Sequence, residues 1–235
     1  MFATPTYDYS VCGEYLASMM MTSIYLTHLK VEVTAQLVAG LCFIDLARNK
    51  LTKAFLDSDA TDLFMIDADV GWEYKAVKRF LDYKQEVVAG LVPKKIDGEA
   101  FHDNALTGEI EDGLLASLEA PTAFIRIKRS ALEKYVEAYP QFKDYYTLDT
   151  GAAIWQTGFS QSPAGTMDFK GEDIFFCRQW IAMGEKIWID PQVEFTHRGS
   201  RAWKGNFIEY AVAKGTIKAT KEPICQVEPL SRTGT

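Results

Sequence analysis

The sequence lacks several features that mark particular classes of protein. It has no Cys-x-x-Cys pair, no internal repeat and no long apolar run. Residues 11–25 are moderately apolar, but they carry Glu14 and several Ser and Thr residues, follow no basic leader, and are too polar to cross a bilayer. The cysteines are widely spaced, so we expect reduced, mostly buried thiols at Cys12, Cys42, Cys177 and Cys225. These absences predict a soluble protein of the cytoplasm, or of the host cytoplasm if a phage or virus encodes it.

An overall excess of basic charge is also missing, which argues against a general nucleic-acid binder. The 235 residues carry a net charge of −7, and 48% of them are hydrophobic, enough to bury a sizeable core. The charge is uneven along the chain. From Arg198 to the end, seven basic residues minus three acidic ones give +4, which leaves −11 for the rest. The last segment can therefore meet an anionic ligand.

Strand and helix patterns alternate along the first ninety residues. Continuous or alternating apolar runs predict strands at 1–7, 31–38, 63–66, 86–91, 123–128, 187–189 and 193–196. Helical spacing predicts helices at 13–30, 47–56, 74–83, 130–139, 172–183 and 207–213. Residues 151–171 are rich in Gly, Ser, Thr and Gln, and we expect a long mobile loop there. The order predicts an α/β fold with a mostly parallel central sheet flanked by helices.

Two carboxylates follow directly on the apolar run at 63–66. At strand spacing, Asp67 and Asp69 point the same way from the carboxyl edge of the sheet, where open α/β folds place their ligands. Two adjacent carboxylates repel each other unless a cation lies between them, and a divalent ion there can bridge the oxygens of a nucleoside diphosphate. The alternative is that Asp67 caps a turn and Asp69 is solvated.

Three further residues are candidates for the same site. Glu172 and Asp173 open a helix with an apolar inner face, either to complement the helix dipole or to act on a substrate as base or hydroxyl anchor. His197 ends an apolar strand and is a candidate third metal ligand, in a set that suits Mn²⁺ better than Mg²⁺. The alternative for His197 is a structural or solvated histidine.

Arg48 begins a helix just before the Asp67–Asp69 strand. Its planar guanidinium can hold a diphosphate or orient the carboxylates. The alternative is an arginine on the helix surface.

In this order, the motifs resemble the small GT-A, family-2-like glycosyltransferases of phages, large DNA viruses and bacteria, and more distantly the fungal mannosyltransferases that share an Ala-Arg-Asn helix. The matching runs cover roughly residues 1–199 and are Ala47-Arg48-Asn49, LFMIDADVGW (63–72), AGLVPKK (89–95), AFIRIKRSALEKY (123–135) and GEDIFFCRQWIAMGEKIWIDPQVEFTHRG (171–199). The resemblance implies a Rossmann-like GT-A domain over residues 1–205, followed by a helical or extended tail at 206–235.

The resemblance also implies a role for each matching residue. A nucleoside-diphosphate sugar is the implied donor, held by Thr4, Pro5, Thr6, Tyr7, Arg48, Asp67 and Lys94, with Lys95 as the alternative to Lys94. The implied metal, Mn²⁺ or Mg²⁺, is held by Asp67, Asp69 and His197, and the acceptor side by Asp173 and Glu172. For glycosyl transfer itself, and apart from the resemblance, we expect a lid around Trp155 and Trp203 that excludes water and limits hydrolysis of the donor.

The expected function is metal-dependent transfer of a sugar to a hydroxyl of a glycan or protein. A modified base of phage DNA is a second acceptor class, suggested by the +4 tail and by Trp203, Phe207 and Tyr210, which can stack on bases. Two alternative functions are a sugar-phosphate nucleotidyltransferase and a non-catalytic binding module. The first normally has a Gly-rich basic loop after strand one, and residues 4–10 contain neither Gly nor Lys or Arg.

Overall fold

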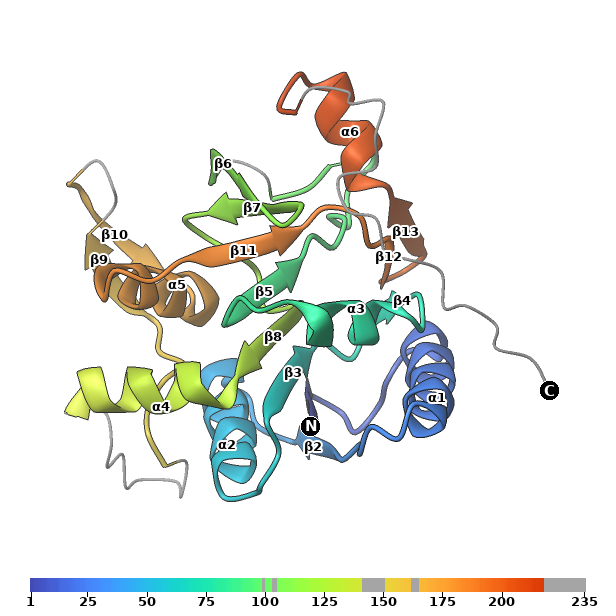
Figure 1. Cartoon of the computed structure of the whole chain (residues 1–235), viewed down its shortest axis with the longest axis horizontal. Coiled ribbons are helices and arrows are strands. Elements are labelled where there is room, and N and C mark those ends of the chain that lie inside the picture. Colours follow the sequence, from blue (N-terminus) through green and yellow to red (C-terminus); the bar gives the residue numbers. More distant parts are fainter. Residues whose placement is uncertain (99, 103–104, 141–150, 162–164, 218–235) are drawn as a thin grey trace.

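An eight-stranded sheet runs through the centre of the computed structural model, which describes residues 1–98, 100–102, 105–140, 151–161 and 165–217 (Figure 1). In spatial order its strands are β2 (Ala35–Ala39), β1 (Phe2–Thr6), β3 (Asp62–Ile66), β8 (Phe124–Lys128), β5 (Val87–Gly90), β11 (Ile187–Asp190), β7 (Leu114–Ser117) and β6 (Leu106–Glu111). β8 and β7 are antiparallel to both of their neighbours, so these two strands oppose the direction of the other six. The predicted α/β class, a mostly parallel central sheet flanked by helices, is confirmed.

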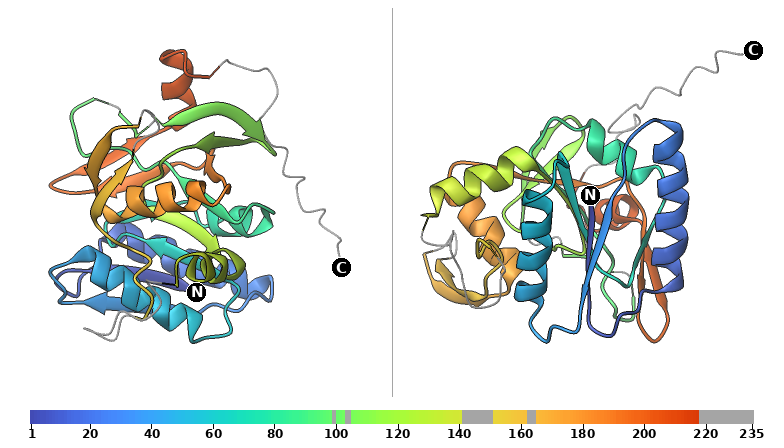
Figure 2. Two further views of the ribbon diagram at one scale, coloured as in Figure 1. Left: turned by 90° about the vertical axis from the view of Figure 1, so that its left-hand side faces the viewer. Right: turned by 90° about the horizontal axis from the view of Figure 1, so that it is seen from below.

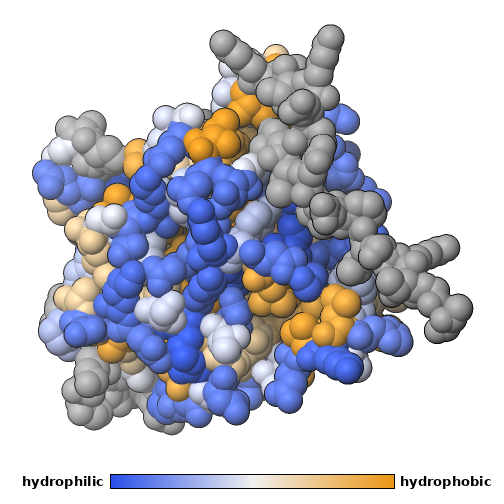
Figure 3. All heavy atoms as spheres, in the orientation of Figure 1, coloured by the Kyte–Doolittle hydropathy of each residue, from blue (hydrophilic) through white to orange (hydrophobic). Residues whose placement is uncertain are grey.

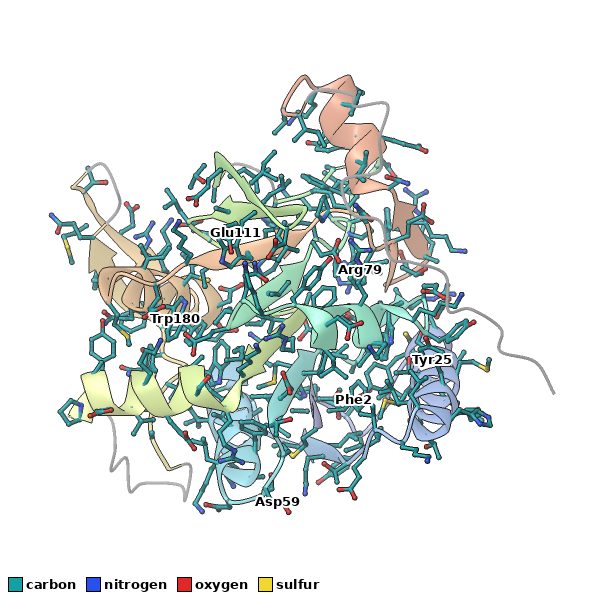
Figure 4. All side chains as sticks on the ribbon, in the orientation of Figure 1. Phe2, Tyr25, Asp59, Arg79, Glu111 and Trp180 are labelled. Carbon is teal, nitrogen blue, oxygen red and sulfur yellow. The ribbon has the colours of Figure 1, made fainter. Side chains whose placement is uncertain are left out.

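Helices cover both faces of this sheet (Figure 2). They are α1 (Gly13–His28), α2 (Ile44–Leu56), α3 (Ala76–Asp82), α4 (Arg129–Ala138), α5 (Glu172–Ala182) and α6 (Phe207–Ala213). Helices α2, α4, α5 and α6 contribute to one apolar core, which contains Trp180, and α1 and α3 contribute to the other, which contains Phe2 (Figure 4). Strand β3 feeds both cores, because Leu63 and Met65 face the first while Phe64 and Ile66 face the second. Burial on both faces explains its continuous apolar sequence.

Two small sheets extend this framework. Strands β13 (Ala202–Gly205), β12 (Phe195–Arg198) and β4 (Val70–Trp72) form one of them, with antiparallel pairing on both sides of β12. This sheet joins the turn after β3 to a segment more than a hundred residues later, and it therefore places the two parts of the candidate site side by side.

The other small sheet is the hairpin of β9 (Gly158–Gln161) and β10 (Met167–Lys170). It corrects the expectation of a mobile loop at 151–171. Trp155 in the same segment is buried, and its indole Nε1 donates to Thr52 Oγ1 at 2.8 Å, so it belongs to the core and not to a lid. Strands β9 and β10 have only four residues each, too few to show a clear apolar pattern within a segment rich in Gly and Ser.

Other expectations are partly corrected. The strand predicted at 31–38 begins only at Ala35, because Val31 and Val33 pack on the core without joining the ladder. Among the described cysteines only Cys177 is buried, whereas Cys12 is half-buried and Cys42 exposed; Cys225 lies outside the described residues. Phe207 of α6 is buried against Phe101 and is therefore not free to stack on a base.

The surface is mostly polar. Hydrophilic side chains cover most of the face in Figure 3, with an apolar patch at the lower right in the region of α1. The exposed apolar residues of this helix are Leu16, Met20, Met21 and Ile24. Within the described part of the chain, no helix has the length and apolar character that crossing a bilayer requires.

Candidate functional site

The run Asp67-Ala68-Asp69 forms a turn between β3 and β4. The backbone N–H of Val70 donates to Asp67 O at 3.2 Å, that of Cys12 to Ala68 O at 2.9 Å, and that of Arg198 to Asp69 O at 2.8 Å. Each of the three carbonyls is thus tied to a different part of the fold, the last two to α1 and to β12. The two carboxylates are therefore presented from a fixed backbone.

These carboxylates both line the cleft described below, but they have different partners. Strand β3 ends at Ile66, so the alternation of a strand does not apply to the next three residues. Asp67 bonds to Arg48, whereas Asp69 faces Lys95 and His197. In the described residues, no three His, Cys, Asp or Glu side chains are close enough to hold a metal, so Asp67 does not join Asp69 and His197 in one group.

Arg48 lies buried between two acidic side chains. Its Nη2 donates to Asp67 Oδ1 at 2.8 Å and its Nη1 to Glu172 Oε1, while its Nε is buried without a partner among the described residues. The Arg48 side chain is 5% exposed, so the sequence alternative of a surface arginine is wrong. One guanidinium thereby connects α2, the end of β3 and the first turn of α5.

The first turn of α5 carries two carboxyls with raised pKa values. Burial raises the pKa of Glu172 against the opposing effect of Arg48. Burial likewise raises the pKa of Asp173, whose Oδ1 accepts a hydrogen bond from the backbone N–H of Ile174 at 2.7 Å. Glu172 is engaged with Arg48, which leaves Asp173 as the better placed of the two to exchange a proton.

Asp69 and His197 meet across the small sheet. His197 lies opposite Val70 in the β4–β12 register, and its Nε2 is 3.5 Å from Asp69 Oδ1. Its Nδ1 is 2.8 Å from Pro93 O, and since a carbonyl only accepts, Nδ1 carries the proton. In a neutral imidazole, Nε2 then directs a lone pair toward a carboxylate oxygen, an arrangement that a cation between them stabilises. Donation of the second ring nitrogen to a backbone carbonyl is also the usual setting of a metal-ligating histidine.

Lys95 places its ammonium on the other oxygen of Asp69, Oδ2. Burial acts to raise the pKa of Asp69, but its contacts with His197 and Lys95 outweigh burial and lower that pKa. Asp69 is therefore ionised at neutral pH and surrounded by cationic or hydrogen-bonding groups. Of the two lysines suggested by the resemblance, Lys95 is the one that reaches Asp69.

A cleft of about 470 Å³ opens beside these residues. Its lining includes the predicted residues Pro5, Thr6, Tyr7, Arg48, Asp67 and Asp69, together with Asp8, Ser10, Val11, Cys12, Ile44 and Ala68. It lies where the loop after β1 passes the turn after β3, at the carboxyl ends of two neighbouring parallel strands. In the part of the chain that the structure describes, the buried side-chain oxygen of Thr6 has no partner. An unpaired hydroxyl and a guanidinium suit a polar or anionic ligand.

Two predicted donor residues lie outside this cleft. Thr4 is fully buried, and its hydroxyl bonds to the Tyr15 hydroxyl at 2.6 Å, so its side chain anchors α1 to the sheet. Lys94 is half-buried, and its backbone N–H donates to Ala100 O at 2.8 Å.

One ion pair near the site was not anticipated. Glu14 in the first turn of α1 pairs with Arg198, the residue after His197. The hydrogen bonds to Arg198 hold the pKa of Glu14 well below its usual range, at about 2. The pair spans 184 residues of sequence, and only the acidic first turn of a helix hinted at it.

Comparison with known proteins yields similarity in solved structures alone. No protein-family model and no curated protein sequence matches the chain. A197 from STIV is 16% identical over 85% of this chain and 86% of that one, with a TM-score of 0.47. The 4-diphosphocytidyl-2C-methyl-D-erythritol synthase from Anaerococcus prevotii is 11% identical over 77% of this chain and 95% of that one, with a TM-score of 0.34. Both TM-scores lie below 0.5, so any functional assignment rests on the residues of this chain.

Proposed function

We propose that the protein is a GT-A-type glycosyltransferase that moves a sugar from a nucleoside-diphosphate sugar to a hydroxyl group. The observation that carries this proposal is the cleft at the carboxyl edge of the sheet, where Arg48, Asp67 and Asp69 meet the loop after β1. Ligands of open α/β folds bind at this edge. The cleft volume of about 470 Å³ is within the usual range for small-molecule sites.

The donor would lie along the cleft with its base and ribose against Pro5, Thr6 and Tyr7. The Thr6 hydroxyl, which has no partner within the described protein, can pair with a polar atom of the nucleoside. The single positive charge of Arg48 offsets part of the negative charge of Asp67 and Glu172, so a diphosphate can approach these two acidic side chains at a lower electrostatic cost.

Asp69 and His197 would hold a divalent ion. One carboxylate and one imidazole with a correctly oriented second nitrogen form a suitable donor set, and phosphate oxygens commonly supply the remaining ligands of such ions. The bound ion would neutralise negative charge on the nucleoside-diphosphate leaving group. Mixed nitrogen and oxygen ligands favour Mn²⁺ over Mg²⁺.

Asp173 would act as the base. The acceptor hydroxyl gives its proton to Asp173 while its oxygen forms a bond to the anomeric carbon of the donor. The bond from that carbon to the phosphate oxygen breaks, and the nucleoside diphosphate leaves. The raised pKa of Asp173 suits this role, because a stronger base accepts the proton more readily near neutral pH.

A thermal-shift panel of nucleoside diphosphates and their sugars, with and without Mn²⁺, tests the donor. A ligand at a hundredfold excess over its dissociation constant adds roughly 2.7 kcal/mol of stability. We expect one nucleotide to stabilise the wild type in a Mn²⁺-dependent way and to lose that dependence in Asp69→Ala. If no nucleoside diphosphate stabilises the wild type, or if Asp69→Ala responds equally, the proposal fails.

Acceptor transfer is tested separately with the nucleotide sugar found in the panel. Release of nucleoside diphosphate that requires a glycan or protein acceptor supports transfer. Release of pyrophosphate from a nucleoside triphosphate and a sugar phosphate would instead identify a nucleotidyltransferase. Donor binding without any turnover would identify a binding module.

A further inference from the structure

Asp69 has two differently occupied oxygens. Oδ1 faces His197 Nε2 at 3.5 Å, and Oδ2 holds the ammonium of Lys95. The lysine therefore places a positive charge beside the carboxylate that the proposed function assigns to a divalent ion. The Asp69 and Lys95 side chains are 40% and 33% exposed, so this ion pair is open to competition from a cation in solution.

The surroundings of Lys95 fix where this charge can lie. The loop that carries Lys95 is joined to β12 by the contact of Pro93 O with His197 Nδ1, and to the turn after β12 by the ion pair of Asp97 with Arg201. A Cβ added at Gly199 would lie 3.3 Å from Lys95 Cδ, so the aliphatic stem of the lysine runs closely over this glycine. The loop and the small sheet thus direct the ammonium toward Asp69.

We propose that Lys95 is a tethered competitor for the metal ion: its ammonium holds Asp69 in the ligand-free protein and must leave that carboxylate before a divalent ion binds. This inference rests on the proposed metal site at Asp69 and His197. The competition follows from charge, because Asp69 contributes one negative charge and a lysine against it repels a second cation.

The competition makes metal binding depend on the donor. A divalent ion alone must displace the ammonium from Asp69 without supplying an anion in its place. A diphosphate supplies such an anion, so metal and donor each strengthen the binding of the other, and this coupling is reciprocal. Lys95 thereby becomes a residue that favours binding of the metal together with a nucleotide over binding of the metal alone.

Titration of the full-length, ligand-free protein with Mn²⁺, followed by the electron paramagnetic resonance signal of free Mn²⁺, tests the competition without any turnover. A partly exposed ion pair of this kind contributes up to about 1 kcal/mol, so its removal in Lys95→Gln should tighten Mn²⁺ binding by between about twofold and about fivefold. Lys95→Arg keeps the charge and should bind as the wild type does. Lys94→Gln is the matched control, because it removes the same charge from the neighbouring residue and should change the affinity less than twofold.

The outcomes separate this inference from the proposed function. If Asp69→Ala loses Mn²⁺ binding but Lys95→Gln binds no tighter than Lys94→Gln, the competition is wrong and the metal site stands. If Asp69→Ala binds Mn²⁺ as the wild type does, the metal site itself is wrong. If none of these proteins binds Mn²⁺, either alone or with a nucleoside diphosphate present, both are wrong.

Discussion

The buried guanidinium of Arg48 provides the sharpest stability test. The change Arg48→Met keeps a side chain of similar length and leaves Glu172 buried and Asp67 half-buried without their shared cation. Removing one partner of a buried ion pair costs about 3–5 kcal/mol. Asp67 is 31% exposed and is partly stabilised by water, so we expect the lower end, about 3 kcal/mol.

The cost should depend on pH in a defined direction. The pKa of Glu172 is raised in the folded protein, and an acid of this kind destabilises the fold above its folded pKa. The penalty disappears as the pH falls and the carboxyl takes up a proton. Arg48→Met raises this pKa further, so the loss of stability should be larger at pH 8 than at pH 5.

Urea unfolding followed by tryptophan fluorescence measures this loss, because Trp155 and Trp180 are buried. Lys53→Met is a control on the same helix, where the exposed pair with Asp57 contributes about 0.3–0.5 kcal/mol. The double variant Arg48→Met with Glu172→Gln should recover part of the stability, since the orphaned charge is gone. A loss below about 1 kcal/mol at pH 8, or the same loss at both pH values, would refute the reasoning.

Three further changes test other parts of the site. Asp173→Asn should lower turnover by about 10²–10⁴-fold without weakening donor binding, and wild-type turnover should rise with pH through the raised pKa of Asp173; unchanged turnover would exclude it as the base. Thr4→Val leaves the Tyr15 hydroxyl buried and unpaired, at a cost of about 1–3 kcal/mol in urea unfolding, and combination with Tyr15→Phe should restore most of it; additive losses would contradict this pairing. Gly90→Ala introduces a Cβ 2.2 Å from Phe195 Cζ, so it should cost about 1–3 kcal/mol in thermal unfolding and weaken Mn²⁺ binding through β12; an unchanged melting temperature would argue against the tight contact.

The sequence allows long, strongly patterned elements to be predicted well. Strand β3 can be predicted because burial on both faces makes it continuously apolar. The end of α5 can be predicted because a glycine, Gly184, follows the helical pattern, and this residue adopts a positive φ of 86°. Strand β4 has only three residues, and its ladder partner β12 lies more than a hundred residues away. Local patterns carry no information about such a pairing, so this strand was missed.

The candidate site was predictable in its residue types but not in its pairings. Arg48, Asp67 and Glu172 each carry a local signal, yet nothing in the sequence indicates that one guanidinium joins both acids. The different partners of Asp67 and Asp69 follow a strand that ends at Ile66, an end point that the apolar run alone does not tie to either pairing. Lys94 and Lys95 are adjacent and identical in type, so only the folded loop shows that Lys95 is the one that reaches Asp69.

Strand β12 makes the spacing of its residues a structural requirement. Its alternation directs His197 to Asp69 and Arg198 to Glu14, while Phe195 is held against Gly90. Inserting or deleting one residue between Pro191 and Phe195 can be absorbed by the connecting segment as long as Phe195 keeps its place. A one-residue insertion directly after Phe195 would instead exchange the two sides of the strand and present Thr196 to Asp69 in place of His197. Length variation among proteins that share this site should therefore be found before Phe195 and be absent after it.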